Sequence, residues 1–169
     1  AKGGLVNENV EFVSSENEGF GVFASGPIKS GETLIKVPFS MCITVDKVVE
    51  FAGLKQVFED NAGLLDYPDE VLAIALMHGK LFPESSCSWA KHTKMLPVDF
   101  NTTIFWSEAE LEELKGNMVF HLTNMMKRQI DTDFNSIHKP LSEAYPEVLG
   151  GVTKDLYMWA LSIVYSRCL

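Results

Sequence analysis

The sequence predicts an α+β protein whose strands precede its helices along the chain. Short segments rich in β-branched and aromatic residues, each bounded by Gly, Pro or Ser, fall within the first 45 residues. From Asp46 onward, apolar residues recur at helical spacing instead. Because the two patterns are separated and do not alternate, they favour α+β over a parallel βαβ fold.

The strands expected from these segments are Val10–Val13, Gly21–Ala24 and Thr33–Val37, with Met41–Thr44 as a candidate fourth. A sheet usually has about five strands, so this set is too small to close a sheet or barrel.

Six helices are expected in the remainder of the chain. They cover Asp46–Glu59, Asp69–Gly79, Ser88–Met95, Ser107–Leu114, Asn117–Ile137 and Thr153 to the end. Asp46 is expected to cap the first, Pro68 to begin the second and Gly79 to end it. Ser107 and Glu110 have the spacing of a capping box, which is a clear start signal.

Composition restricts the class of protein. The 169 residues are 46% hydrophobic, enough for one core, and carry a formal charge of −9. That charge disfavours nucleic acid as a partner and suits a basic protein segment better. Cys42, Cys87 and Cys168 are widely spaced and odd in number, which favours a reducing compartment. No segment has the length of a membrane span or the apolar core of a signal peptide, so we expect a soluble intracellular chain.

A glycine-containing segment, Glu18–Ala24, is the most informative local feature. Gly19 and Gly21 lack the Cβ atoms that keep a backbone away from a ligand, so the segment is either a hairpin corner or a cofactor cradle. The spacing formally matches a dinucleotide fingerprint. That reading fails because the residues before it are polar and Gly26-Pro27 leaves no room for a following helix.

The last expected helix places Arg167 in line with its apolar stripe. Arg167 lies eleven residues after Leu156 and returns to nearly the same angle at about 3.6 residues per turn. A guanidinium on that side would pair with an anion such as a carboxylate. The alternative is a cation that satisfies the carbonyls at the helix C-terminus.

Other residue groups carry weaker signals. Histidines occur at 78, 92, 121 and 138, without the spacing of a metal site, and are expected at the surface or partly buried. Met118, Met125 and Met126 lie on one apolar helix face, for which a core position is expected. No metal site is expected.

Taken in order, the motifs resemble those of SET-domain methyltransferases of the Rubisco large-subunit methyltransferase type. The matching pieces are Glu18–Ala24, Ile28–Glu32, Leu34–Pro38, Trp89 with Met95-Leu96-Pro97, Phe105-Trp106-Ser107 and Trp159–Arg167. The resemblance covers roughly residues 10 to 167. It implies SET-core strands at 1–45, a helical insertion at 46–152 and a helix at 153–169 that returns to the core.

The same resemblance implies S-adenosylmethionine as methyl donor and a protein side chain, usually lysine, as acceptor. Glu18, Gly19, Phe20 and Gly21 would line the cofactor pocket. Glu18 would lie against the adenosine, Phe20 would offer backbone groups to the methionine portion, and Arg167 would meet the cofactor's carboxylate. The family's Asn-His pair does not occur in this sequence, and no tyrosine sits in a matching context. The catalytic residues therefore stay unknown.

We expect the chain to resemble the first part of a larger enzyme, inactive without a C-terminal portion. The alternative is a non-catalytic, SET-derived scaffold within a protein assembly. The sequence does not distinguish cytoplasm, nucleus or plastid.

Overall fold

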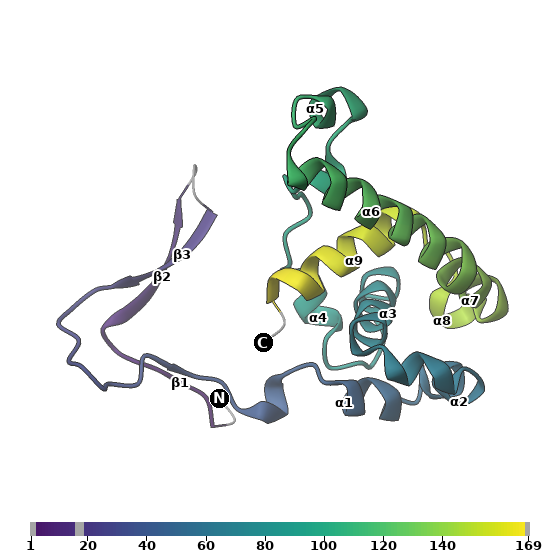
Figure 1. Ribbon diagram of the computed structural model, residues 1–169. Helices are drawn as coiled ribbons and strands as arrows, with labels where there is room; N and C mark the ends of the chain where they lie inside the picture. Colours follow the sequence, from purple (N-terminus) through teal and green to yellow (C-terminus); the bar gives the residue numbers. More distant parts are fainter. Residues whose placement is uncertain (1–2, 16–18, 168–169) are drawn as a thin grey trace. The chain divides into compact units, whose positions relative to one another are not determined.

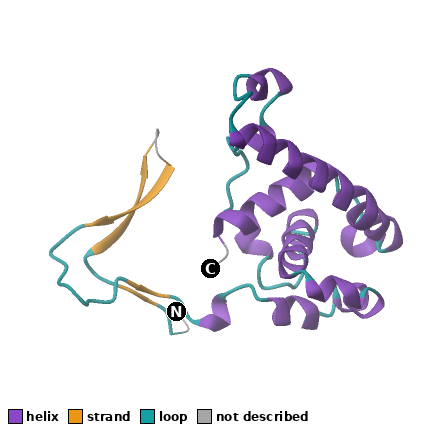
Figure 2. Ribbon diagram, in the orientation of Figure 1, coloured by secondary structure: helices purple, strands orange, loops and turns teal. Residues whose placement is uncertain are grey.

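The structure, a computed structural model, describes residues 3–15 and 19–167 and divides the chain into two compact units, Ala1–Cys42 and Ile43–Leu169 (Figure 1). Figure 2 shows that, in the described ranges, the strands lie in the first unit and the α-helices in the second. The predicted α+β class, with strands before helices, is therefore confirmed. Each unit is described by itself below.

The first unit contains two antiparallel strand pairs. The short strand β1 (Leu5–Val6) pairs with β4 (Ile35–Lys36), and β2 (Val10–Ser15) pairs with β3 (Gly19–Ala24). Between β1 and β2, the side-chain oxygen of Asn7 accepts a hydrogen bond from the Asn9 backbone N–H at 2.9 Å. This side-chain turn is one that asparagine favours because its amide mimics a backbone group.

Two strand predictions in this unit need correction. The strand expected at Thr33–Val37 is reduced to β4, which pairs over only two residues of β1. The candidate strand at Met41–Thr44 does not form. Instead Phe39–Met41 make a 3₁₀ turn, η1, in which the Met41 backbone N–H donates to the Pro38 carbonyl at 2.8 Å. A local turn satisfies that donor without a partner strand.

The second unit is built around the helix α3 (Pro68–Leu81), whose residues from Ala73 to Gly79 are all buried. Helices α1, α4, α8 and α9 pack against it. The elements in chain order are α1 (Val45–Glu50), α2 (Lys55–Asp60), the 3₁₀ helix η2 (Ala62–Asp66), α3, α4 (Ala90–Thr93), the 3₁₀ helix η3 (Thr103–Phe105), α5 (Glu108–Glu112), α6 (Met118–Asp133), the π-helical turn η4 (Phe134–His138), α7 (Lys139–Ala144), α8 (Pro146–Leu149) and α9 (Lys154–Arg167).

Gly79 does not end α3 as predicted. The helix continues to Leu81, and a Cβ atom at Gly79 would lie 2.9 Å from Thr93 Cγ2 and 3.0 Å from Trp89 Cδ1. The missing side chain lets α4 approach closely, and the Thr93 hydroxyl donates to the Gly79 carbonyl at 3.1 Å. This glycine therefore serves packing between helices, with no role in helix termination.

The helix predicted at 46–59 is two helices. α1 begins after Thr44, so Asp46 lies inside its first turn and is not its cap. Phe51 ends α1 and packs its ring against Trp89, with ring centroids 5.3 Å apart and a T-shaped geometry. The chain bends here so that this aromatic contact can form.

The predicted capping box at Ser107 is confirmed, and the structure also shows an asparagine cap at Asn117, where a helix was expected to begin. The Ser107 hydroxyl accepts from the Glu110 backbone N–H at 3.3 Å, and the Glu110 carboxylate accepts from the Ser107 backbone N–H at 2.8 Å. Asn117 caps α6 by accepting from the Val119 N–H at 2.9 Å. The capping box depends on residues three positions apart, which is why sequence alone identifies it.

Candidate functional site

The predicted glycine segment lies in the hairpin of the first unit. Gly19, Phe20 and Gly21 are strand residues of β3, opposite Ser15, Ser14 and Val13, so the strand begins two residues earlier than predicted. Glu18 lies outside the described residues. Because β3 pairs with β2 alone in the described sheet, alternate backbone N–H and C=O groups of β3 point away from β2 and are not engaged in that pairing.

Gly21 has a packing reason of its own. A Cβ atom at this position would lie 2.5 Å from Cε2 of the Phe23 ring, closer than real side chains approach. The absence of a side chain at Gly21 thus makes room for Phe23, two residues along the same face of the strand.

The helix that carries Arg167 is buried on nearly every side. Apart from half-buried Met158, every residue of α9 from Tyr157 to Val164 is buried, and α9 packs on α3, α6 and η4. We predicted a single apolar stripe. Instead, neighbouring elements surround the middle of this helix. The buried Ser162 hydroxyl finds its partner within α9, because it donates to the Met158 carbonyl at 2.8 Å.

Arg167 is exposed, although its angle on the helix is that of the buried side. Burial of α9 ends at Val164, one turn earlier, so the surrounding helices do not reach the arginine. Its guanidinium donates a hydrogen bond from Nη1 to the hydroxyl of the neighbouring Ser166 at 2.6 Å. The expectation of a core-facing arginine is therefore wrong. Gly19–Gly21 and Arg167 belong to different units, and their joint role remains a prediction.

A buried polar network, which the sequence did not reveal, joins α3, η4 and α9. The Tyr157 hydroxyl donates to Glu70 Oε1 at 2.7 Å, and His138 Nε2 lies 2.8 Å from Glu70 Oε2. The His138 and Tyr157 rings pack with centroids 3.9 Å apart. Both rings are buried, and the Glu70 side chain is 14% exposed. Their separations of 68 and 87 residues explain why no local pattern indicates the network.

The network stabilises the charged form of Glu70. Burial by itself would raise the pKa of this carboxyl, but the hydrogen bonds to His138 and Tyr157 outweigh it and leave the pKa below its ordinary value. Burial, and then the neighbouring Glu70 carboxylate, raise the pKa of Tyr157. Tyr157 therefore stays a neutral donor and Glu70 an anionic acceptor at neutral pH.

His78 and His138 are fully buried, whereas the histidines were expected at the surface or partly buried. His78 Nδ1 lies 2.8 Å from the Val148 carbonyl, and its Nε2 lies 3.2 Å from the Ser85 hydroxyl. Burial lowers the pKa of His78, so the ring is neutral at neutral pH. Its two contacts connect α3 with α8 and with the loop after α3, which is a structural role.

The methionine face of α6 is exposed, so its predicted core position is wrong. Met118 is 74% exposed and Met125 is 59% exposed, while Thr123 and Ile130 supply the buried side of this helix. Periodicity identifies an apolar face but does not say which neighbour covers it.

Neither metal binding nor membrane insertion is indicated by the part of the chain that the structure describes. Its His, Cys, Asp and Glu side chains form no group of three suited to a metal ion. It also contains no helix with the length and apolar character that crossing a membrane requires.

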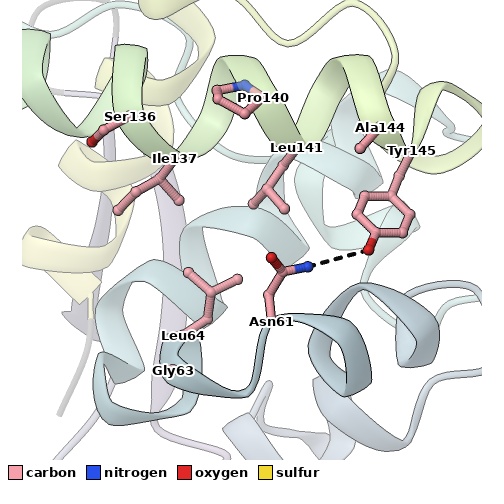
Figure 3. Close-up of a pocket in the computed structure, with 9 residues that line it drawn as sticks. All are labelled: Asn61, Gly63, Leu64, Ser136, Ile137, Pro140, Leu141, Ala144 and Tyr145. Atoms are coloured by element: carbon pink, nitrogen blue, oxygen red, sulfur yellow. Dashed lines mark hydrogen bonds between the residues drawn. The ribbon is translucent and has the colours of Figure 1, made fainter.

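A hollow of about 380 Å³ opens between η2 and α7 in the second unit (Figure 3). It is lined by Asn61, Gly63, Leu64, Ser136, Ile137, Pro140, Leu141, Ala144 and Tyr145. The Tyr145 hydroxyl donates to Asp60 Oδ2 at 2.8 Å and accepts from the Asn61 amide at 3.2 Å. These bonds hold the polar edge of the hollow in a fixed orientation.

Comparison with known proteins identifies the class. No protein-family model matches the chain. It is 28% identical over 151 residues to the Rubisco large-subunit N-methyltransferase of Nicotiana tabacum, and 26% identical over 175 residues to the actin-histidine N-methyltransferase of Gallus gallus. These alignments cover 89% and 97% of this chain but only 29% and 28% of those proteins.

A solved structure of Rubisco LSMT bound to sinefungin and monomethyllysine matches 94% of this chain and 36% of its own, with a TM-score of 0.74 and 25% identity. A solved structure of the SET domain of LSMT, bound to methyllysine and AdoHcy, matches 99% of this chain and 37% of its own, with a TM-score of 0.76 and 24% identity, so the fold is that of this SET domain. In sequence, the chain is similar to Rubisco large-subunit N-methyltransferases, as the ordered motifs predicted. It spans about three-tenths of the length of the curated relatives that it matches.

Proposed function

We propose that this chain contributes to methyl transfer from S-adenosylmethionine to a protein side chain, with lysine as the acceptor. The observation that carries this proposal is the similarity to protein N-methyltransferases over nearly the whole chain, in sequence and in fold. Because a lysine-type and a histidine-type enzyme are both similar to it, the nitrogen acceptor is the shared part of the proposal and lysine its finer part.

Two features of this chain support a cofactor site. The exposed Arg167 guanidinium donates one hydrogen bond to Ser166 and keeps further N–H donors suited to a carboxylate. Gly19, Phe20 and Gly21 lie on β3, and the backbone groups on the side of β3 away from β2 take no part in the pairing of these two strands. Glu18, outside the described residues, is proposed at the adenosine. When bound, S-adenosylmethionine supplies a methyl group on a positively charged sulfur.

The reaction would be a direct displacement. The acceptor nitrogen uses its lone pair to form a bond to the methyl carbon, the carbon–sulfur bond breaks, and its electron pair goes to sulfur. The nitrogen must be neutral for this step, and its extra proton leaves to water or a base. The residues named above contribute binding and alignment, which lower the entropic cost of the reaction. We assign no catalytic residue in this chain.

A non-catalytic scaffold is the second candidate. The exposed apolar face of α6, with Met118 and Met125, favours it because such a face suits contact with another protein. With either function, we place this protein in a reducing intracellular compartment, because its three cysteines are widely spaced and odd in number.

Calorimetric titration with S-adenosylmethionine distinguishes the two candidates. We expect the wild-type chain to bind and Arg167→Ala to bind at least about tenfold more weakly, since a hydrogen bond to a charged group contributes about 1.5–3 kcal/mol. Arg128→Ala removes the same charge from the exposed surface of α6 and should leave the affinity unchanged. Absence of wild-type binding, or equal binding by the Arg167 variant, would count against the cofactor site.

A further inference from the structure

We propose that the hollow between η2 and α7 is a binding site for a neutral, mainly apolar group that carries one N–H or O–H donor. This site is independent of methyl transfer and lies wholly within the second unit. Its volume of about 380 Å³ falls at the lower end of the range of about 300–1,000 Å³ for ligand pockets, which suits a ring-sized group.

The side-chain donors at the hollow are already used by the protein. Asn61 donates both amide hydrogens, to the Val57 carbonyl at 2.8 Å and to the Tyr145 hydroxyl at 3.2 Å. Tyr145 donates to Asp60 at 2.8 Å, and Ser136 donates to the Thr132 carbonyl at 2.7 Å. A ligand that needs to accept a hydrogen bond from these side chains, such as a carboxylate or phosphate, is therefore disfavoured.

Acceptors at the hollow remain available to a ligand. The Ser136 hydroxyl, which donates its own hydrogen, keeps its lone pairs, and Asn61 Oδ1 accepts no hydrogen bond from any described residue. Figure 3 shows the Asn61 oxygen directed toward Leu64 and Leu141, away from Tyr145. The orientation is imposed by the two donated bonds, because the reversed amide would turn its oxygen toward the Val57 carbonyl. The hollow thus presents a fixed acceptor to an incoming donor.

The side chains that line the hollow favour a ligand that is apolar and uncharged apart from its donor group. Leu64 and Leu141 are buried beside the acceptor, and Ile137 on η4, with Pro140 and Ala144 on α7, extends the apolar surface. None of the residues that line the hollow is charged, so an ionic group would lose hydration without gaining a counter-charge. A neutral apolar body with a single donor satisfies both the walls and Asn61.

Indole is a small molecule with these properties, and 1-methylindole is its matched control because it lacks the N–H. We would titrate each into the ¹⁵N-labelled chain and follow amide shifts of residues 61–64 and 136–145. Indole should shift these amides, and 1-methylindole should bind several-fold more weakly, since a hydrogen bond contributes about 0.5–1.5 kcal/mol net.

Two variants and one control test the role of Asn61. Asn61→Ala should remove the preference for indole over 1-methylindole. Asn135→Ala deletes an asparagine that also donates to the carbonyl four residues earlier, at 2.7 Å, but does not line the hollow, and should keep the preference. Ala144→Phe should fill the hollow from an exposed position and abolish binding of both probes, while the amide spectrum shows that the chain stays folded.

N-acetyltryptophanamide, which carries indole on a peptide-like backbone, tests whether the bound group belongs to a protein or to a free small molecule. Binding with the same Asn61 dependence would assign the site to a tryptophan of a partner protein, whereas binding of indole alone would assign it to a free small molecule. The proposal is overturned if indole leaves the amides of residues 61–64 and 136–145 unshifted, or if both indoles bind the wild-type chain equally.

Discussion

Replacing Tyr157 by phenylalanine tests whether the Glu70–His138–Tyr157 network stabilises the helical unit. The substitution deletes only the hydroxyl that donates to Glu70 Oε1 at 2.7 Å. The ring can keep its contact with His138, whose centroid lies 3.9 Å away. The change therefore isolates one hydrogen bond from the packing around it.

The expected loss follows from burial and charge. A hydrogen bond to a charged group contributes about 1.5–3 kcal/mol, and its removal is most costly where water cannot replace the donor. Tyr157 is 0% exposed, so water does not reach the position of the lost hydroxyl. His138 still contacts the other carboxylate oxygen at 2.8 Å, which keeps Glu70 partly satisfied. We therefore expect the free energy of unfolding to fall by about 2 kcal/mol.

Urea denaturation followed by tryptophan fluorescence measures this loss, because Trp159 lies in the core on the same helix. Tyr165→Phe is the matched control: it makes the same change on α9 at a residue that is 56% exposed, and should alter the free energy by about 0.5 kcal/mol or less. If the two variants lose the same free energy, the network does not stabilise the fold in the way the geometry indicates.

Three further predictions follow from the packing of the helical unit. The pKa of Glu70 is lowered from 4.5 in the folded chain, so the unfolded chain binds the proton first as pH falls. The stability that ionised Glu70 contributes should therefore be complete above about pH 4.5 and should disappear as pH falls through the pKa of the folded chain. Glu70→Gln should lose less stability over this pH range when unfolding is measured at a series of pH values. His78, whose pKa burial lowers from 6.5, should add a loss that begins below about pH 6.5 and is absent in His78→Phe. Gly79→Ala should lower the free energy of unfolding by about 1–3 kcal/mol, because its Cβ would meet Thr93 and Trp89. Gly63→Ala, with nothing within 4 Å of its Cβ, should leave thermal and urea stability unchanged or slightly raised, and an equal loss in both glycine variants would contradict the packing argument.

Local signals predicted much of the secondary structure. The capping box at Ser107 was identified correctly because it depends on residues close in sequence. The prediction failed where an element needs a distant partner. The strand at Met41–Thr44 has the right residue types, yet the chain there forms a 3₁₀ turn and a helix start.

The candidate site shows the same division. The sequence placed Gly19, Phe20 and Gly21 near a hairpin and Arg167 at the end of a helix, and the structure has them there. It could not predict that burial of α9 ends at Val164, because this depends on how far the neighbouring helices extend. The Glu18–Arg167 constellation itself remains a prediction.

By itself, the sequence determined the α+β class, the capping box at Ser107 and the resemblance to SET-domain methyltransferases, since these depend on residue type and short spacing. Only the tertiary structure decided that Met118 faces outward, that Gly79 is a packing residue and that Glu70, His138 and Tyr157 meet. The physical reason is that burial and long-range hydrogen bonds depend on which surfaces come together. Helical and strand periodicity identify an apolar face, but the neighbouring elements determine what covers it.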